Sequence, residues 1–389
     1  MRQEKILSII LLAFSIEYLG YGELSVYRVI ILPLSFYGLL NMKRNSVNTL
    51  RYNLFIVLFM LYFAFCSMMT DTNPLFAILC LPFMLYIGNS MAAGTFSYVN
   101  VARIFSLYSL PHIVAYLLFR QYAFLEEGRF NGLHEDSNFC GIYLLIAFAA
   151  SALQLFIKKE QGKWKQFDRI NCLVCLYLIV ITGSRGAMLT CLLFLAFLLL
   201  KSNLRKIYKY IVVILVFIGY IFVNRYIESL PVYMTADDGY IDFVLSRFKD
   251  ENMEGGSNRI EFWTWAFDAM SKEPPYVPVG TNFMGRVFYT HNSYVDLLLE
   301  LGLIQGAIFV IFYAFNLMNT IRYILKPVSL VVLVMYTSAI VVSITLFLLS
   351  ADRSKLFWMM FCFVIYRPTL KNTYNEQIYS FNNNPRLQR

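Results

Sequence analysis

Long apolar stretches alternate with short polar segments along almost the whole chain. Many of these stretches are long enough to approach or cross a bilayer core of roughly 30 Å. They lack the apolar–polar alternation of a strand, and a segment inside a bilayer must satisfy its own backbone groups, which favours helices. The pattern therefore predicts an all-α polytopic membrane protein with about 12 transmembrane helices. These helices are expected near residues 6–20, 26–41, 53–69, 74–90, 101–119, 138–157, 170–183, 186–200, 210–224, 293–318, 328–350 and 355–367.

The composition agrees with a membrane protein. Hydrophobic residues make up 59% of the chain and charged residues only 15%, whereas a soluble domain carries about a quarter charged residues. The first stretch resembles a signal peptide, with Arg2 and Lys5 before an apolar core, but no small-residue cleavage site follows. Because more apolar stretches come after it, we expect a retained first helix. Cys172 and Cys175 have redox or metal spacing, but they lie in an apolar run without partner ligands, which favours packing.

Lysine and arginine cluster in alternate short connections, which predicts the orientation in the membrane. One set of connections, together with the two chain ends, holds 21 of the 33 basic residues. We therefore expect both termini to be cytoplasmic. The net charge of +9 follows from this asymmetry and does not indicate nucleic acid. The expected organisation is a membrane bundle at 1–224, an external loop at 225–290, a second set of membrane helices at 291–367 and a cytoplasmic tail at 368–389.

The external loop is expected to carry a short helix. Ser257 or Asn258 can cap its start, and the two prolines at 274–275 end it. One apolar face, formed by Ile260, Trp263, Phe267 and Met270, suits a helix that lies on the membrane or covers the bundle. Arg259 is a less ordinary choice in the first turn, because a cation there opposes the helix dipole.

Four external patches place an arginine or a histidine at or just before a helix start, at residues 128–141, 182–189, 257–267 and 280–302. Helix N-termini favour anions because they offer free amide donors and partial positive charge. Arginine adds a planar fork that suits phosphate oxygens. Several such groups on one membrane face indicate a receptor for a lipid-linked phosphate or diphosphate.

Each patch also has an ordinary structural explanation. Arg185 can snorkel between two short helices. Arg129 and His134 can belong to a solvated loop. Arg286 can be a surface charge, and His291 can simply end a loop.

Three further residues are ambiguous in the same way. His112 lies beside a proline inside an apolar stretch, which favours a packed histidine at a kink. Asp296 and Glu300 lie one turn apart after His291, where they can orient its ring; a salt bridge or a solvated face is the ordinary explanation. The helix dipole opposes an extra proton on His291, so we expect this histidine to stay neutral at pH 7 and to act as a base.

Taken together, the four patches resemble the O-antigen ligase and polymerase superfamily. Gly-Ser-Arg-Gly at 183–186 looks like its Ser-Arg-Gly signature, and 258–280 resembles its external pattern of arginine, tryptophan, proline and glycine. The His-Asn pair followed by nine residues and a glycine, at 291–302, is similar to its histidine motif. Residues 129–138 look like its upstream Arg-x-x-Gly and Pro-Asn element, with Ser137 in place of the proline.

The resemblance implies glycosyl transfer from an undecaprenyl-diphosphate-linked sugar to a hydroxyl acceptor. Cations would stabilise the departing diphosphate, and a base would take the proton of the acceptor hydroxyl. No nucleotide or metal motif is present, so we expect no cofactor and a metal-independent reaction. The candidate catalytic residues are His291, Arg185 and Arg259, and the candidate diphosphate- or substrate-binding residues are Arg129, Arg286, Asn138 and Asn292.

Three functions are compared. A polymerase joins lipid-linked repeat units, which are then both donor and acceptor, with membrane lipid and a chain-length regulator protein as further partners. A ligase transfers the polysaccharide to lipid A-core. Gln305 stands where the ligase form of the motif has Gly, Thr or Tyr, which favours the polymerase. A flippase is expected to have repeats or charges buried inside its helices, whereas the charged candidates here gather on one face. We expect a bacterial inner-membrane enzyme whose site faces the exterior.

Overall fold

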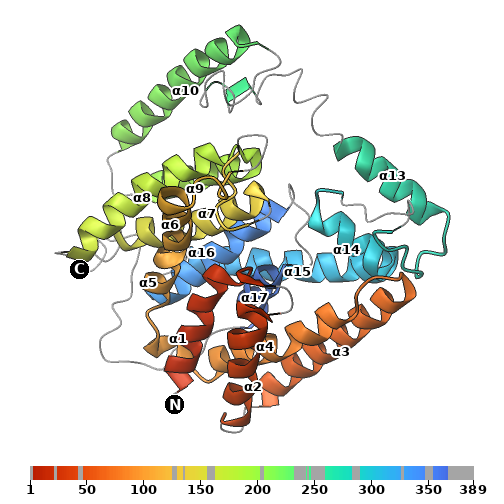
Figure 1. Ribbon diagram of the computed structural model, residues 1–389. Helices are drawn as coiled ribbons and strands as arrows, with labels where there is room; N and C mark the ends of the chain where they lie inside the picture. The colour runs from red at the N-terminus through yellow and green to blue at the C-terminus, as the bar shows by residue number, and fades with distance from the viewer. Residues whose placement is uncertain are drawn as a thin grey trace.

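The computed structural model describes residues 3–21, 24–42, 47–124, 129–134, 136–155, 163–201, 206–231, 242, 245–246, 259–282, 290–325, 328–346 and 354–366. Within these ranges the regular structure is helical, apart from a short hairpin (Figure 1). The hairpin pairs β1 (Gly20–Tyr21) with β2 (Leu24–Ser25) in antiparallel fashion. The predicted helical membrane architecture is therefore confirmed.

The first part of the chain contains α1 (Gln3–Ala13), η1 (Phe14–Ile16), η2 (Tyr27–Ile31), α2 (Leu32–Leu40), α3 (Val47–Met69), α4 (Leu75–Ala92), η3 (Thr95–Tyr98), α5 (Val101–Ser106), η4 (Leu107–Ser109) and α6 (Leu110–Leu118). The second part contains α7 (Ser137–Leu153), α8 (Lys163–Ile181), α9 (Arg185–Lys201), α10 (Lys206–Ser229), α13 (Arg259–Ser271), α14 (Ser293–Leu301), α15 (Leu303–Ile324), α16 (Leu330–Thr345) and α17 (Lys355–Ile365).

Three helices form the centre of the bundle. Nearly every side chain of α7, α16 and α17 is buried, as expected for helices that are apolar on all sides. α7 packs against α5, α8 and α16, and α17 packs against α4 and α16. Helices α9 and α14, whose starts carry the candidate site, pack against α16 of this central layer.

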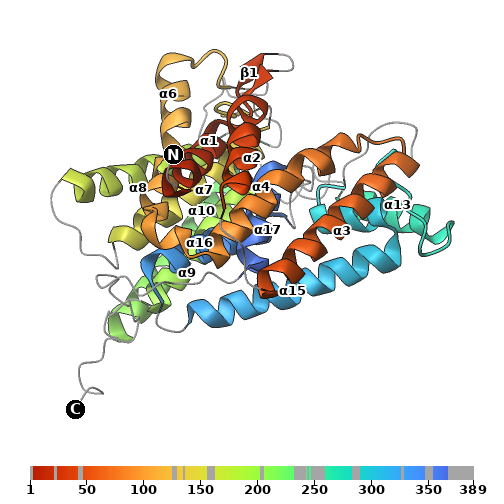
Figure 2. The ribbon, with the colours of Figure 1, turned by 90° about the horizontal axis from the view of Figure 1, so that it is seen from below.

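The outer surface of the bundle is apolar instead of polar. α3 exposes Leu54, Leu58, Leu61, Phe65 and Met68, and α15 exposes Ile304, Ile308, Ile311, Phe315 and Met318. Both sets repeat at the spacing of one helix face. Figure 2 shows α3 and α15 side by side, with the rings of Phe59 and Phe309 stacked at 4.4 Å between centroids. Such large apolar surfaces suit contact with lipid.

Four described segments are long and apolar enough to cross a membrane: Thr49–Met69, Leu75–Ala92, Val101–Leu118 and Leu303–Ile324. Shorter apolar helices accompany them, among them α7, α16 and α17. The total of about 12 spans stays a prediction, as does the division into external and cytoplasmic segments.

Two of the predicted helices are longer than the helices that the structure contains. The helix expected at 293–318 is broken at Gly302, where φ 85° and ψ 152° fit only glycine comfortably. The chain bends there between α14 and α15. The helix expected at 6–20 ends at Ile16, after which the chain turns into the short hairpin.

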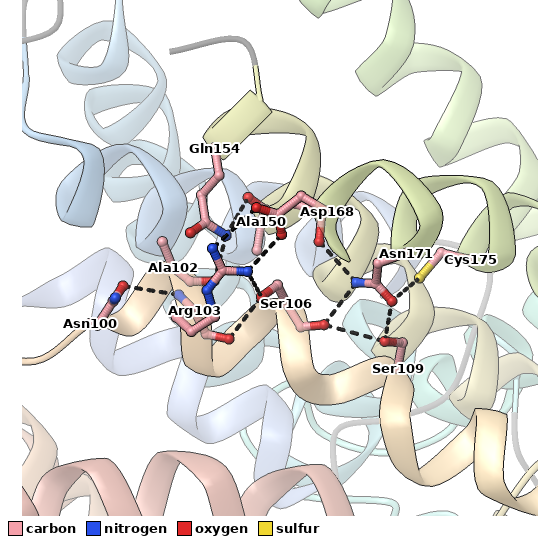
Figure 3. Close-up of polar contacts among 11 residues, drawn as sticks. Asn100, Ala102, Arg103, Ser106, Ser109, Ala150, Gln154, Asp168, Asn171 and Cys175 are labelled. Carbon is pink, nitrogen blue, oxygen red and sulfur yellow. Dashed lines mark hydrogen bonds and ion pairs between the residues drawn. The ribbon is translucent and has the colours of Figure 1, made fainter. Parts of the chain in front are cut away.

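A buried ion pair joins α5 to α8 (Figure 3). The guanidinium of Arg103 donates to both carboxylate oxygens of Asp168, at 2.8 and 3.1 Å, and its carbon lies 4.2 Å from the ring centroid of Trp164. Asn171 extends the network by donating to the carbonyl of Ser106 at 2.8 Å. This pair lies inside the bundle.

Candidate active site at the starts of two helices

The histidine motif forms a tight turn before α14. Asn292 caps the helix: its side-chain oxygen accepts from the backbone N–H groups of Tyr294 and Val295, at 3.0 and 3.3 Å. A short polar side chain is favoured at this position because it satisfies amides that have no partner within the helix. The Asn292 side chain is buried in this role.

His291 adopts a left-handed conformation, with φ at 55°. This region is uncommon for residues with a side chain, although histidine is among those found there more often. The imidazole is partly exposed and lies against the ring of Phe262, with 6.0 Å between centroids and 29° between planes. The turn therefore presents the ring beside the external helix α13.

Asp296 is buried and does not belong to a solvated face. Its Oδ1 atom accepts from the backbone N–H of Thr290 at 3.1 Å and lies 2.8 Å from the Thr290 hydroxyl. Glu300 is also buried. The expectation of a solvated face is therefore wrong for both acids.

The external helix α13 packs directly on α14. Ala266 and Met270 of α13 form an apolar cluster with Val295 and Leu299 of α14. The indole N–H of Trp263 donates to the carbonyl of Thr290 at 3.0 Å, which joins α13 to the turn before α14.

The predicted apolar face of α13 is only partly correct. Ile260 is 79% exposed and Phe267 is 47% exposed, so the buried face runs through Trp263, Ala266 and Met270 instead. Arg259 is the first residue of α13, one turn before Phe262, and its side chain lies outside the description. Asn258 and Arg286 also lie outside the described residues.

Arg129 and Arg185 meet at the start of α9. Gly183 turns with φ 60°, and the Ser184 hydroxyl accepts from the N–H of Ala187 at 3.3 Å, so α9 begins at Arg185 as predicted. The Nε atom of Arg129 donates to the carbonyl of Thr182 at 3.1 Å. Arg185 is half-buried, and the two guanidinium groups are close enough to repel each other. Two cations held together in this way suit a ligand with more than one negative charge.

The solvated-loop explanation of Arg129 and His134 is wrong, because both side chains are buried. The His134 ring stacks on Tyr143 at 4.7 Å between centroids and meets the edge of Tyr18 at 4.9 Å. Tyr143 in turn donates to the carboxylate of Glu17 at 2.7 Å. The loop that carries Arg129 is therefore anchored to the first helical segment.

The titratable groups of this anchor are shifted by burial. Burial raises the pKa of Glu17 from 4.5 to about 7, and the charge of Lys355 opposes the rise. Burial, helped by the neighbouring His112, lowers the pKa of His134 well below 6.5. His112 is packed at the start of α6, beside its proline, as predicted.

Asn138 has a capping partner. Its side-chain amide donates to the carboxylate of Asp136 at 2.9 Å, and its backbone N–H donates to the same oxygen at 2.7 Å. Asp136 is the residue that caps α7. Asn138 therefore belongs to the start of α7, next to the loop of Arg129.

The first turns of α9 and α14 both contact the end of α16. Tyr294 of α14 donates to the carbonyl of Ser343 at 3.0 Å. Two residues later, Thr345 lies within hydrogen-bond distance of Thr190 of α9, at 3.3 Å, and Thr190 donates to the carbonyl of Gly186 at 2.8 Å. We call the region around Ser343 and Thr345, at the end of α16, the site end. The turn of His291 lies on one side of it and the arginines of the α9 turn lie on the other.

Sequence reasoning did not identify Thr290, nor the contact between Phe262 and His291. The spacing of Thr290 and Asp296 around the helix start was the available signal, because a side chain before the cap can reach the first turn. Gln305, the departure from the ligase form, lies at the bend beside Gly302. The whole of α14, a nine-residue helix, separates it from His291.

Residues 170–311 match the model of the protein family described as O-Antigen ligase. Comparison with curated proteins found no match. The matched region contains the turn at 182–185, helix α13 and the turn at 290–292, and it excludes Arg129. The residues that form the site end are thus largely the matched ones, and residues 170–311 of the chain are similar to the O-antigen ligase family.

Proposed function

We propose that the chain is a polymerase that joins undecaprenyl-diphosphate-linked oligosaccharide repeat units on the outer face of the bacterial inner membrane. The match of residues 170–311 to the O-antigen ligase family supports a glycosyl-transferring membrane enzyme that acts on lipid-linked saccharides. One observation carries the proposal: paired arginines lie at the start of α9, a partly exposed histidine lies at the start of α14, and both helices contact the same end of α16.

The arginines have the role of binding the donor diphosphate. Arg129 and Arg185 lie together at a helix N-terminus, where free amides add to the positive potential. Arg259, at the start of α13, is the third proposed cation. Charge develops on the diphosphate as the bond from the sugar carbon to its oxygen breaks. Donors already in place at that oxygen lower the barrier by roughly 3–4 kcal/mol each.

His291 has the role of general base. In the proposed step, its imidazole takes the proton of an acceptor hydroxyl while that oxygen forms a bond to the sugar carbon. The diphosphate leaves with the electron pair of the broken bond. A correctly placed base contributes about 10²–10⁴ in rate. The stack of His291 on Phe262 supports this role, because it fixes one face of the ring and leaves the side chain partly exposed.

The matched family model supports a second candidate, an O-antigen ligase that uses the same donor and takes lipid A-core as acceptor. Gln305 favours the polymerase over the ligase. Gln305 lies at the α14–α15 bend, one helix away from His291 along the chain.

A flippase is the third candidate. The buried pair of Arg103 and Asp168 removes part of the argument against it, because charges do lie inside the bundle. The pair is closely matched and tied into a structural network, which suits a helix clamp better than a transport path.

Deletion of the gene in a bacterium that makes lipopolysaccharide separates the three functions. We expect core capped by a single repeat unit, seen as one band above bare core on a gel, and a full ladder when the wild-type gene is restored. The His291→Ala variant should insert normally and fail to restore the ladder, whereas Lys272→Ala, an exposed change just after the end of α13, should restore it. Bare core with long chains on the lipid carrier would contradict the polymerase and support the ligase. Absence of both polymer and single surface repeats would support a flippase.

A further inference from the structure

The unusual backbone of His291 has to be held in place by its surroundings. A residue with a β-carbon at φ 55° is strained and persists only where neighbouring contacts enforce it. Its two neighbours in sequence are Thr290 and Asn292, which are both buried, while His291 itself is partly exposed. The anchors of the turn therefore lie on either side of the histidine.

Every polar group of Thr290 is used. Its backbone N–H donates to Asp296 Oδ1 at 3.1 Å, and its carbonyl accepts from the indole of Trp263 at 3.0 Å. Its hydroxyl lies 2.8 Å from the same oxygen of Asp296 and 3.0 Å from the carbonyl of Asn292. The hydroxyl also accepts from the N–H of Asn292 at 3.3 Å.

These contacts close a clamp around His291. The Thr290 hydroxyl reaches across the histidine to both backbone groups of the following residue. Asp296 fixes Thr290 from the first turn of α14, and its own side chain is completely buried. Through Thr290, the carboxylate of Asp296 can set the direction of the His291 imidazole without contacting the ring.

We propose that Asp296 and Thr290 are positioning residues that hold His291 in its left-handed conformation and aim its imidazole at the acceptor. Asp296 acts through Thr290. Trp263 adds a link from the same residue to α13, so the clamp also fixes the helix that begins with Arg259. The inference rests on the proposed role of His291 in catalysis.

Four variants test the clamp in purified protein that elongates lipid-linked repeat units. Thr290→Val removes the hydroxyl and keeps the branched shape, whereas Thr290→Ser keeps the hydroxyl. Asp296→Ala removes the acceptor, whereas Asp296→Asn keeps an oxygen that can face Thr290. The matched control is Thr264→Val on α13, because that hydroxyl is exposed and bonds only within its own helix.

We expect Thr290→Val and Asp296→Ala to lower kcat by about tenfold or more with KM changed by less than about threefold, since the base is misaligned and binding is not removed. Thr290→Ser and Asp296→Asn should recover most of kcat. If Asp296→Asn is folded and as inactive as Asp296→Ala, the carboxylate charge acts directly and the positioning role is overturned.

A chemical readout separates this inference from the proposed function. Diethyl pyrocarbonate modifies accessible neutral imidazoles, and His291 is partly exposed whereas His112 and His134 are buried. Mass spectrometry should show that Thr290→Val changes the modification rate of His291 and that Thr264→Val leaves it unchanged. An unchanged rate with unchanged kcat in Thr290→Val would overturn the clamp. Full activity of His291→Ala would overturn the proposed base while this rate still reports on the clamp.

Discussion

Removing one partner of the buried pair between Arg103 and Asp168 should destabilise the protein strongly. Asp168 is completely buried, and the Arg103 side chain is only 10% exposed. Asp168→Ala would leave the guanidinium without the two carboxylate oxygens that it contacts at 2.8 and 3.1 Å. Stranding a buried charge in this way costs roughly 3–5 kcal/mol. At about 2 °C per kcal/mol for a long chain, the unfolding midpoint should fall by roughly 6–10 °C.

The double variant Arg103→Met with Asp168→Leu distinguishes a stranded charge from lost packing. Replacing both partners by apolar residues removes the desolvation penalty together with the attraction, so its cost should be well below that of Asp168→Ala. Part of the cost remains because the Arg103 guanidinium also lies over Trp164.

The exposed pair between Lys272 and Asp268 is a matched control. Lys272 Nζ and Asp268 Oδ2 are 2.6 Å apart, but the two side chains are 70% and 59% exposed. Asp268→Ala should therefore cost about 0.5 kcal/mol or less. The midpoints can be measured in detergent by heating a fluorescent fusion and following the monodisperse fraction. Equal effects of Asp168→Ala and Asp268→Ala, or a double variant as unstable as the single one, would refute the reasoning.

Three further changes test other parts of the structure. Arg185→Lys should yield little polymer, because lysine lacks the planar fork of arginine. Its control, Arg322→Lys on the exposed part of α15, should leave the gel ladder unchanged. An intact ladder from Arg185→Lys would show that the planar fork is not required. Gly302→Ala should cost about 1–3 kcal/mol in thermal unfolding, because φ is 85° and the added carbon would lie 3.1 Å from the Tyr276 carbonyl; an unchanged midpoint would contradict the bend. Glu17 has a folded pKa of about 7, above its ordinary 4.5, so the folded state holds the proton more tightly and stability should fall as pH rises from about 4.5 to 7. Glu17→Gln should flatten that fall, and parallel midpoint-against-pH curves for the two proteins would show that this carboxyl does not titrate as described.

Local signals in the sequence predicted the helix starts that carry the site. Asn292 caps α14 through its own side chain, and the turn at Gly183 requires positive φ, so both features depend on residues next to one another. The arginine at the start of α9 was found for the same reason.

Features that depend on distant parts of the chain were missed. His134 is buried because Tyr18 and Tyr143 pack against its ring, and Arg129 contacts Thr182, 53 residues away; nothing within the loop sequence indicates these contacts. The break at Gly302 was hidden because apolar residues continue on both sides of it. The pairing of Arg103 was also missed, because its partner Asp168 lies 65 residues away.

The face of α13 was misjudged because a helix of mixed apolar residues offers more than one possible apolar face. The packed face includes the small Ala266, which fits against α14, whereas the larger Phe267 is exposed. The size of the residues that contact α14 decided which face of α13 is buried, and the periodicity of the sequence does not indicate this.

The most direct test of the central claim is reconstitution of the purified protein in vesicles with undecaprenyl-diphosphate-linked repeat units as the sole saccharide. The polymerase account predicts a ladder of carrier-linked products in which each step adds one repeat, with undecaprenyl diphosphate released. The His291→Ala protein should give no ladder, and added lipid A-core should not be required. No product until lipid A-core is supplied, followed by transfer of the saccharide to that acceptor, would contradict the polymerase and establish a ligase.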